Sequence, residues 1–414
     1  MEKQLTLKKL VIYLLCIFFV LIFVSLLLLA LSSHKTIAAF YGISERNQKC
    51  IETLLNQTSI KKNKKNPAYE FITLDSTVPL KKAIKAAKKP DLLFIYGGLN
   101  ADYAASLAVK NRTCFSKDIL NGMSSSVIQT VKISNDKVPA VPVLIDHYEI
   151  DIQRAKFDSS SINDINTLSD VEQFALLSKS STMSPVIFAG GDDSELINIF
   201  GALVEAVSGR RAIESGAEKI RKSISIGKTS QTAFFNLLLE LTTSGGEWYE
   251  TAELLKQWSK INILPKNIFQ MTSKDVSAFL ESNLSVIAFM TLSEHRITKR
   301  DVVSRYNSTF IPGHSIDVER NLTAPIIYAI QLKKGKQANS SVKLLTDSLQ
   351  GTLCAKTGLA PVQKNSTVPD IQSDDVRYWV AASGTPMQAL SDSAFTNKAN
   401  RSAFAEALRT VLKE

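Results

Sequence analysis

The feature that most constrains the fold is an alternation of apolar runs and helical patterns near the start of the chain. Apolar, β-branched and aromatic residues dominate three short runs, which is typical of buried strands, and two segments between them carry apolar residues at helical spacing. The order strand, helix, strand, helix, strand predicts a mainly parallel sheet covered by helices. We expect strands at 36–42, 69–74 and 91–98 and helices at 45–57 and 79–89.

Small and aromatic residues follow two of these expected strands. Tyr41 and Gly42 end the first strand, Tyr96 and Gly97 end the third, and Asn100 comes soon after. In open sheets of this kind, ligands bind beyond the carboxyl ends of the strands. We therefore expect these five residues to contact a ligand.

The rest of the chain continues the alternation with longer helical stretches. At 414 residues it is too long for one ordinary hydrophobic core, so we expect two lobes. In the middle, Gly190, Gly191, Asp192 and Asp193 separate an apolar run from a helical pattern. Such a turn can contact a ligand, because glycine permits close approach of the backbone. Alternatively, it only joins a strand to a helix whose first turn an Asp caps.

Residues 10–31 form an uncharged apolar run that follows Lys3, Lys8 and Lys9. About 20 apolar residues span a bilayer core, and flanking lysines stay in the cytoplasm. The run predicts a single-pass anchor in a bacterial inner membrane, with the C-terminal domain in the periplasm or outside the cell. A cleaved signal peptide is the alternative, because Ala30 and Ser32 are small residues at plausible cleavage positions.

The formal charge of +10 does not indicate a nucleic-acid partner. Much of the excess lies in residues 61–65 and 81–89, where no aromatic residue interleaves with the lysines as a stacking platform requires. An exported chain with such a surface suits anionic lipid headgroups instead.

Cysteine and histidine patterns indicate no metal or cofactor. Cys50, Cys114 and Cys354 are widely spaced, which excludes a site built from cysteine pairs and allows at most one disulfide. No two histidines stand three or four residues apart on an expected helix.

One tripeptide suggests an enzyme. Lys356, Thr357 and Gly358 resemble the Lys-Thr-Gly of penicillin-recognising serine hydrolases, which pair it with a Ser-x-x-Lys motif. Ser-x-x-Lys occurs here at residues 32–35 and 59–62, but Ser-Asp-Asn is absent and Pro361 follows the tripeptide closely. We keep an exported serine hydrolase as the third alternative and expect no enzymatic activity.

The order of segments resembles the maltose-binding-protein-like (family 1) extracellular solute-binding proteins, the receptors of ABC importers. The likeness covers roughly residues 36–361, and the helix start at residues 167–172 departs from the family pattern because it lacks the Trp. The matching positions are Pro90-Asp91 with Gly97-Gly98, Val141-Pro142-Val143, Ile287-Ala288-Phe289-Met290, and Gln350, Gly358 and Pro361.

The resemblance implies a two-lobed, type II periplasmic-binding-protein-like α/β fold with a hinge. It implies capture of a small solute, a sugar or oligosaccharide being favoured, and delivery to ABC permease subunits. The same fold without a ligand, serving as an envelope interaction protein, is the second alternative. The expected division is 1–34 cytoplasmic stub and anchor, 35–143 first lobe, 144–291 second lobe, 292–335 return to the first lobe, and 336–414 C-terminal helices mainly in the second.

Aromatic residues are the natural platform for a sugar, since its C–H groups pack on flat apolar faces. Trp248 and Tyr249 follow Gly245-Gly246, which we expect to release the chain toward the cleft, whereas Trp258 lies within a helical pattern and is expected to pack in the core. The complete expected ligand site is Tyr41, Gly42, Tyr96, Gly97, Asn100, Asp146, Tyr148, Gly190, Asp192, Trp248, Tyr249 and His295.

Overall fold

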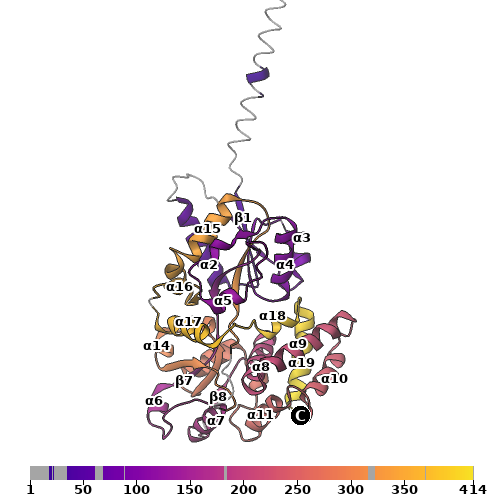
Figure 1. The fold of residues 1–414 in the computed structure, drawn as a ribbon. Helices are drawn as coiled ribbons and strands as arrows, with labels where there is room; N and C mark the ends of the chain where they lie inside the picture. The colour runs from indigo at the N-terminus through magenta and orange to yellow at the C-terminus, as the bar shows by residue number, and fades with distance from the viewer. Residues whose placement is uncertain are drawn as a thin grey trace, which may run out of the picture.

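The fold consists of two α/β lobes, seen at the top and bottom of the folded part in Figure 1. Each lobe has its own sheet and its own cluster of buried apolar side chains. The computed structural model describes residues 18–20, 22, 35–60, 69–87, 89–180, 184–315, 322–368 and 370–413.

The first lobe is built on a six-stranded sheet with the order β12-β6-β11-β3-β1-β2. Its first three strands are parallel, as the sequence predicts, and Phe40 of β1 stacks on Phe94 of β3 with ring centroids 5.5 Å apart. Strand β11 runs antiparallel to both of its neighbours. The strands are β1 (Thr36–Tyr41), β2 (Tyr69–Leu74), β3 (Leu92–Tyr96), β6 (Val141–Ile145), β11 (Ile326–Gln331) and β12 (Ala360–Pro361).

Helices from both ends of the chain cover this sheet. Ala104 and Ala108 of one helix are fully buried, because small side chains let a helix approach the sheet closely. The elements of this lobe outside the main sheet are α2 (Glu45–Ile60), α3 (Leu80–Ala86), α4 (Leu99–Lys110), β4 (Phe115–Ser116), η1 (Lys117–Leu120), α5 (Ser125–Gln129), β5 (Lys137–Val138), α15 (Lys336–Thr346), α16 (Gln350–Thr357) and α17 (Ile371–Ser383).

The second lobe contains a four-stranded sheet, β10-β7-β9-β8, and a larger group of helices. Helix α8 (Asp193–Ser208) lies at its centre, and residues 196–207 are all buried because other helices and the sheet surround it. The remaining elements are β7 (Tyr148–Gln153), α6 (Arg154–Asp158), α7 (Leu168–Leu177), β8 (Val186–Ile187), α9 (Arg210–Ser225), α10 (Gln231–Thr242), α11 (Tyr249–Lys260), η2 (Ile268–Gln270), α12 (Ser273–Glu281), β9 (Ile287–Thr291), α13 (Leu292–Ile297), α14 (Arg300–Val303), β10 (Tyr306–Phe310), α18 (Leu390–Ala394) and α19 (Lys398–Lys413).

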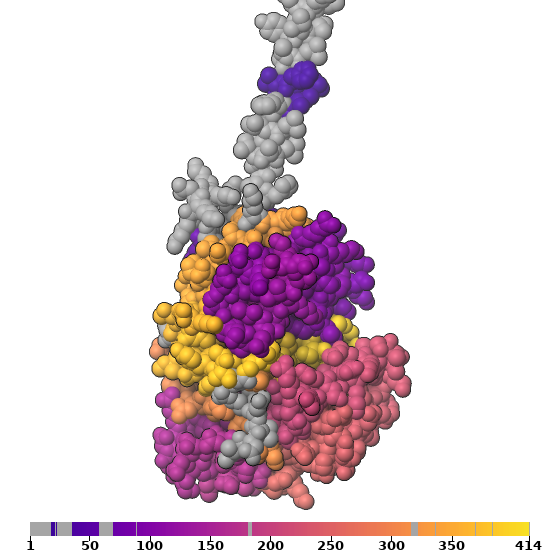
Figure 2. Space-filling model, viewed as in Figure 1, coloured from indigo at the N-terminus to yellow at the C-terminus, as the bar shows by residue number. Residues whose placement is uncertain are grey.

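The chain crosses between the lobes through short extended segments that lie side by side. Strand β6 ends at Ile145 and β7 begins at Tyr148, so only two residues separate strands of different sheets. The amide of Asp146 donates to the carbonyl of Pro325 at 2.8 Å, and the amide of Tyr148 donates to Thr323 at 3.1 Å. Figure 2 shows the C-terminal segment, in yellow, lying between the first lobe and the helices of the second.

Two of the expected lobe boundaries need correction. Residues 306–310 form β10, which pairs with β7, so the return to the first lobe comes after residue 310 and not at residue 292. The C-terminal region was expected mainly in the second lobe, but α15, α16 and β12 pack on the first sheet and only α18 and α19 join the second core. The order of elements alone does not show which sheet a strand joins.

None of the helices in the described part of the chain combines the length and apolar character that a membrane crossing requires. Of the expected anchor at residues 10–31, the structure describes only residues 18–20 and 22, which are helical. The remainder of that expectation lies outside the described residues.

Candidate functional site

A cavity of about 760 Å³ lies between the lobes, at the carboxyl ends of β1 and β3. The opposite wall comes from the start of β7, the first turn of α8 and the start of α13, and the C-terminal segment closes one side. Eight residues of the expected site line it: Tyr41, Gly42, Tyr96, Gly97, Asn100, Asp146, Tyr148 and Asp192. The carboxyl ends of the predicted strands therefore border a cavity, as expected, and we call this cavity the cleft.

Asp146 is the carboxylate that joins the two lobes across the cleft. Its Oδ2 accepts hydrogen bonds from Ser293 Oγ at 2.6 Å and from Tyr96 OH, of the first lobe, at 3.4 Å. Its Oδ1 accepts from the amides of His147 and Ser293. Burial raises the pKa of Asp146, and the hydrogen bonds oppose that rise.

Glu195 and Glu294 place two further carboxyl groups in the cleft. Tyr148 OH donates to Glu195 Oε2 at 3.3 Å, and Ser273 Oγ donates to Glu294 Oε1 at 2.8 Å. Burial raises the pKa of both acids; the charge of Glu294 raises that of Glu195 further, and the charge of Asp146 raises both. Burial also raises the pKa of Asp392, on the C-terminal side of the cleft, to about 6. Acidic groups with raised pKa values that line a cavity mark it as a candidate functional site.

The Gly190-Gly191 turn is explained by packing. A β-carbon on Gly190 would lie 2.6 Å from the carbonyl oxygen of Ile268, and one on Gly191 would lie 2.5 Å from that of Gln270. Gly191 lines the cleft, whereas Gly190, which was expected to, does not. The glycines let the turn lie directly against the loop before α12.

Asp192 occupies the N-cap position of α8 but makes no capping hydrogen bond with its side chain. Its Oδ2 instead accepts from the amide and the hydroxyl of Ser273, at 2.9 and 2.8 Å. The single hydroxyl proton of Ser273 is shared between Asp192 Oδ2 and Glu294 Oε1, each 2.8 Å from Oγ, so Ser273 links the two acidic side chains on the second-lobe wall of the cleft.

Trp248 and Tyr249 do not form a wall of the cleft, and that expectation is wrong. The side chain of Trp248 is fully buried in the second-lobe core, where its ring meets Phe200 edge-on at 5.5 Å. Its Nε1 donates to the carbonyl of Ala212 at 3.0 Å. Tyr249 begins α11, is partly exposed, and does not line the cleft. Trp258, by contrast, is buried as predicted.

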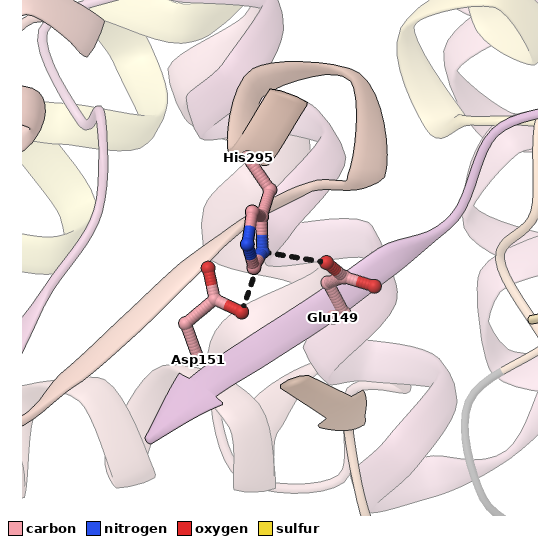
Figure 3. A group of neighbouring side chains, drawn as sticks. All are labelled: Glu149, Asp151 and His295. Carbon is pink, nitrogen blue, oxygen red and sulfur yellow. Dashed lines mark hydrogen bonds and ion pairs between the residues drawn. The ribbon is translucent and has the colours of Figure 1, made fainter. Parts of the chain in front are cut away.

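His295 also lies outside the cleft. It is buried behind the cleft wall, where its Nδ1 lies 2.9 Å from Asp151 Oδ1 and 3.4 Å from Glu149 Oε1 (Figure 3). Burial raises the pKa of Glu149 to about 8. Burial lowers the pKa of His295, but the neighbouring carboxylates outweigh it and raise that pKa to about 10. These three residues also form the group that could hold a metal ion in the described part of the chain.

Several residues that line the cleft are not among the residues predicted from the sequence. Glu195 and Asn198 lie about one and two helical turns after Gly191, so the helical pattern that follows this turn would have indicated them. Asp392, Lys398 and Arg401 reach the cleft from the C-terminal segment, and no local pattern marks them.

A second cavity, of about 630 Å³, lies on the other side of the segment that follows β3. Gly97 lines both cavities, but the second is bounded by α9, through Arg210 and Glu214, and by Tyr328 of β11. We place the candidate site in the cleft because the strand ends and the hydrogen-bonded carboxyl groups converge there.

The Lys-Thr-Gly tripeptide does not form the strand that a serine hydrolase requires. Lys356 and Thr357 end helix α16, and Gly358 is its C-cap residue with φ 75°. A β-carbon at position 358 would lie 2.4 Å from Arg296 Cγ, which explains the glycine without chemistry.

The whole fold is similar to that of several solved binding proteins. The putative binding protein MsmE from Bacillus subtilis, in an open conformation, matches with a TM-score of 0.64 at 13% identity, covering 92% of this chain and 94% of that chain. The fold is that of a two-lobed solute-binding protein. This similarity confirms the expected two-lobed α/β architecture. No protein-family model and no curated protein sequence matches the chain.

Two further matches extend over nearly the whole of both chains. The bacterial solute receptor AcbH, described as exclusive for β-D-galactopyranose, matches with a TM-score of 0.63 at 14% identity, covering 91% of this chain and 96% of that one. Maltose-bound MalE3 of T. maritima matches with a TM-score of 0.60 at 13% identity, covering 92% and 98%. The similarity in fold thus extends over both lobes.

Proposed function

We propose that this chain is an extracytoplasmic receptor that captures a sugar or oligosaccharide in the cleft for an ABC importer. The observation that carries the proposal is the position of the cleft, between two lobes joined by short extended crossings. Closure of such lobes about a few crossing residues is the established way in which two-lobed receptors enclose a ligand. No covalent chemistry is assigned to any residue of the cleft.

The charges of the cleft favour an uncharged, hydroxyl-rich solute. Six carboxyl groups line it, against the two cations Lys398 and Arg401, so an anion would meet net repulsion. The hydroxyl groups of a sugar both donate and accept hydrogen bonds, and the acidic, hydroxyl and amide side chains that line the cleft supply partners for both. Tyr41, Tyr96 and Tyr148 add ring surface for C–H groups.

The similar structures agree with this solute class. Besides galactose and maltose receptors, they include RafE in complex with raffinose and a chitin-oligosaccharide-binding protein. At 12 to 15% identity these similarities do not identify a particular sugar for this chain.

The proposal includes the membrane and the permease. The uncharged run at residues 10–31 would anchor the chain in a bacterial inner membrane and hold the two lobes near the ABC permease subunits that receive the solute. Fractionation of the full-length chain tests the anchor. We expect the intact protein in the inner-membrane fraction, with a C-terminus that protease added from outside can cleave. A mature form in the soluble fraction that begins near Ser33 would contradict it.

Mass spectrometry and thermal unfolding test the solute. Native mass spectrometry of the purified full-length chain is expected to show one bound small molecule per chain. Galactose, maltose, raffinose and a chitin oligosaccharide are then added singly, and at least one is expected to raise the unfolding temperature, because a ligand that binds only the folded state stabilises it. Failure of every sugar, together with the absence of any bound molecule, would favour the ligand-free interaction protein.

A further inference from the structure

A second polar cluster lies behind the cleft wall, at the start of the second sheet. Glu149 and Asp151 stand two residues apart on β7 and therefore point to the same face of the strand, where His295 of α13 meets them (Figure 3). His147 precedes them at the same spacing, and its Nδ1 lies 4.0 Å from Glu149 Oε2.

The polar atoms of this cluster are crowded around one nitrogen. Three oxygens surround His295 Nδ1: Asp151 Oδ1 at 2.9 Å, Ser308 Oγ at 3.0 Å and Glu149 Oε1 at 3.4 Å. An imidazole nitrogen offers a single bonding direction, as one N–H donor or one lone pair. Gln372 Nε2 also lies 3.1 Å from Nδ1, so two carboxyl groups, a hydroxyl and an amide converge on a nitrogen that can bond only one of them.

Burial makes the arrangement costly. The exposed fractions of Glu149, Asp151 and His295 are 0%, 2% and 3%. Glu149 Oε2 has no hydrogen-bond partner among the residues that the structure describes, although Gln372 donates to the other oxygen of the same carboxyl group. Glu149 Oε2 is therefore a buried polar atom that a further group would have to satisfy, because a buried polar atom without a partner is costly.

We propose that Glu149, Asp151 and His295 bind a divalent metal ion of the zinc type. Zinc bonds of about 2.0 to 2.2 Å to imidazole nitrogen and carboxylate oxygen place tetrahedral ligand atoms roughly 3.3 Å apart. The two carboxylate oxygens lie 2.9 and 3.4 Å from Nδ1, which is close to that value, so these three side chains supply three corners of the tetrahedron. Two carboxylates and a neutral imidazole balance the charge of a 2+ ion.

The surroundings hold these ligands in place and connect the site to the hinge. Ser308 of β10 donates to Asp151, and Gln372 of α17 donates to Glu149. Helix α17 packs on the first-lobe core through Val376 and Val380. The metal would therefore join the second sheet to a helix of the first lobe, directly beside the Asp146-His147 crossing.

Metal analysis of the wild-type protein is the first test. The full-length chain is purified without chelators, dialysed against buffered Zn²⁺, and analysed by mass spectrometry for metal content and by X-ray absorption at the zinc edge. We expect one zinc per chain, with only nitrogen and oxygen neighbours at about 2.0 to 2.2 Å. A chain that retains no zinc would overturn the proposal, as would sulfur neighbours, which would assign the ion to cysteine.

Variants then assign the ion to these residues. Asp151→Asn and His295→Gln keep the side-chain size and are each expected to weaken zinc binding more than 100-fold, since loss of a supporting group alone costs about 10- to 100-fold. His314→Gln is the matched control, because His314 is exposed and should leave binding unchanged. Unchanged zinc affinity in both cluster variants would overturn the assignment. If a variant fails to fold, the wild-type stoichiometry and spectrum still decide.

Discussion

Gly216 of α9 and Trp248 lie in direct contact, so that a β-carbon at position 216 would come within 2.1 Å of Trp248 Cζ2. The indole occupies the space that the missing side chain leaves, and its NH is satisfied by Ala212. The relationship makes Trp248 a central packing residue of the second lobe.

This contact predicts that Trp248 contributes to stability and leaves solute affinity unaffected. Trp248→Ala should lower the free energy of unfolding by about 3 to 5 kcal/mol, because truncation leaves a cavity. Gly216→Ala should cost about 1 to 3 kcal/mol through overpacking. Denaturant unfolding measures both. The neighbouring Tyr249→Ala is the control and should cost less than either, since Tyr249 is partly exposed. A Trp248→Ala protein of unchanged stability that binds the solute more weakly would contradict this packing role and indicate a role in solute binding.

Glu205 should make stability depend on pH. It is buried in α8, where it accepts a 2.7 Å hydrogen bond from Thr323, and burial raises its pKa from 4.5 to about 7. Its contribution is complete below pH 4.5, where both states are protonated, and is lost as pH rises toward 7 because the unfolded state ionises first. The loss is on the order of 3 kcal/mol.

Comparison of the wild type with Glu205→Gln isolates that effect. The neutral amide cannot ionise, so the variant should gain stability relative to the wild type between pH 4.5 and 7, with no further gain above. Chemical denaturation at several pH values measures the difference. Glu214→Gln, at an exposed glutamate of α9, should show no such slope. A stability difference for Glu205→Gln that is independent of pH would show that Glu205 ionises normally.

The three cysteines of the folded lobes should differ in their contribution to stability. Cys354 is fully buried, whereas Cys50 and Cys114 are half-buried, and all three are free thiols. Cys354→Ser should cost on the order of 1 kcal/mol or more, because it places a hydroxyl in an apolar core, and Cys50→Ser should cost less than about 0.5 kcal/mol. Thermal unfolding compares them. Equal losses would indicate that burial does not set the cost.

The first three strands and two helices could be predicted because their information is local. Each strand of residues 36–98 is an apolar run bounded by turn residues, and each helix has a regular apolar face. The strand ends then located one wall of the cleft, since parallel strands present their carboxyl ends at one edge.

The remainder depends on contacts between distant segments. Residues 141–153 form two strands that only Asp146 and His147 separate, yet the two strands belong to different sheets. The Gly245-Gly246 pair was expected to lead toward the cleft, but it turns the chain back: a β-carbon on Gly246 would lie 2.3 Å from the carbonyl oxygen of Leu241. Such close approaches leave no periodic signal in sequence.

Glu195 provides the sharpest test of the cleft as a solute site. It lines the cleft from the first turn of α8, and the hydrogen bond that it accepts from the Tyr148 hydroxyl is long, at 3.3 Å. Glu195→Ala should therefore fold normally while removing a solute contact. A loss of about 1.4 kcal/mol or more corresponds to a tenfold or larger rise in Kd.

The decisive measurement is calorimetric titration of the sugar that raises the unfolding temperature into the wild type, Glu195→Ala and Glu214→Ala. We expect one binding site per wild-type chain, at least tenfold weaker binding by Glu195→Ala, and unchanged binding by Glu214→Ala. Without sugar, all three proteins should unfold at similar temperatures. Equal affinity of the wild type and Glu195→Ala, with both fully folded, would contradict the placement of the solute in the cleft.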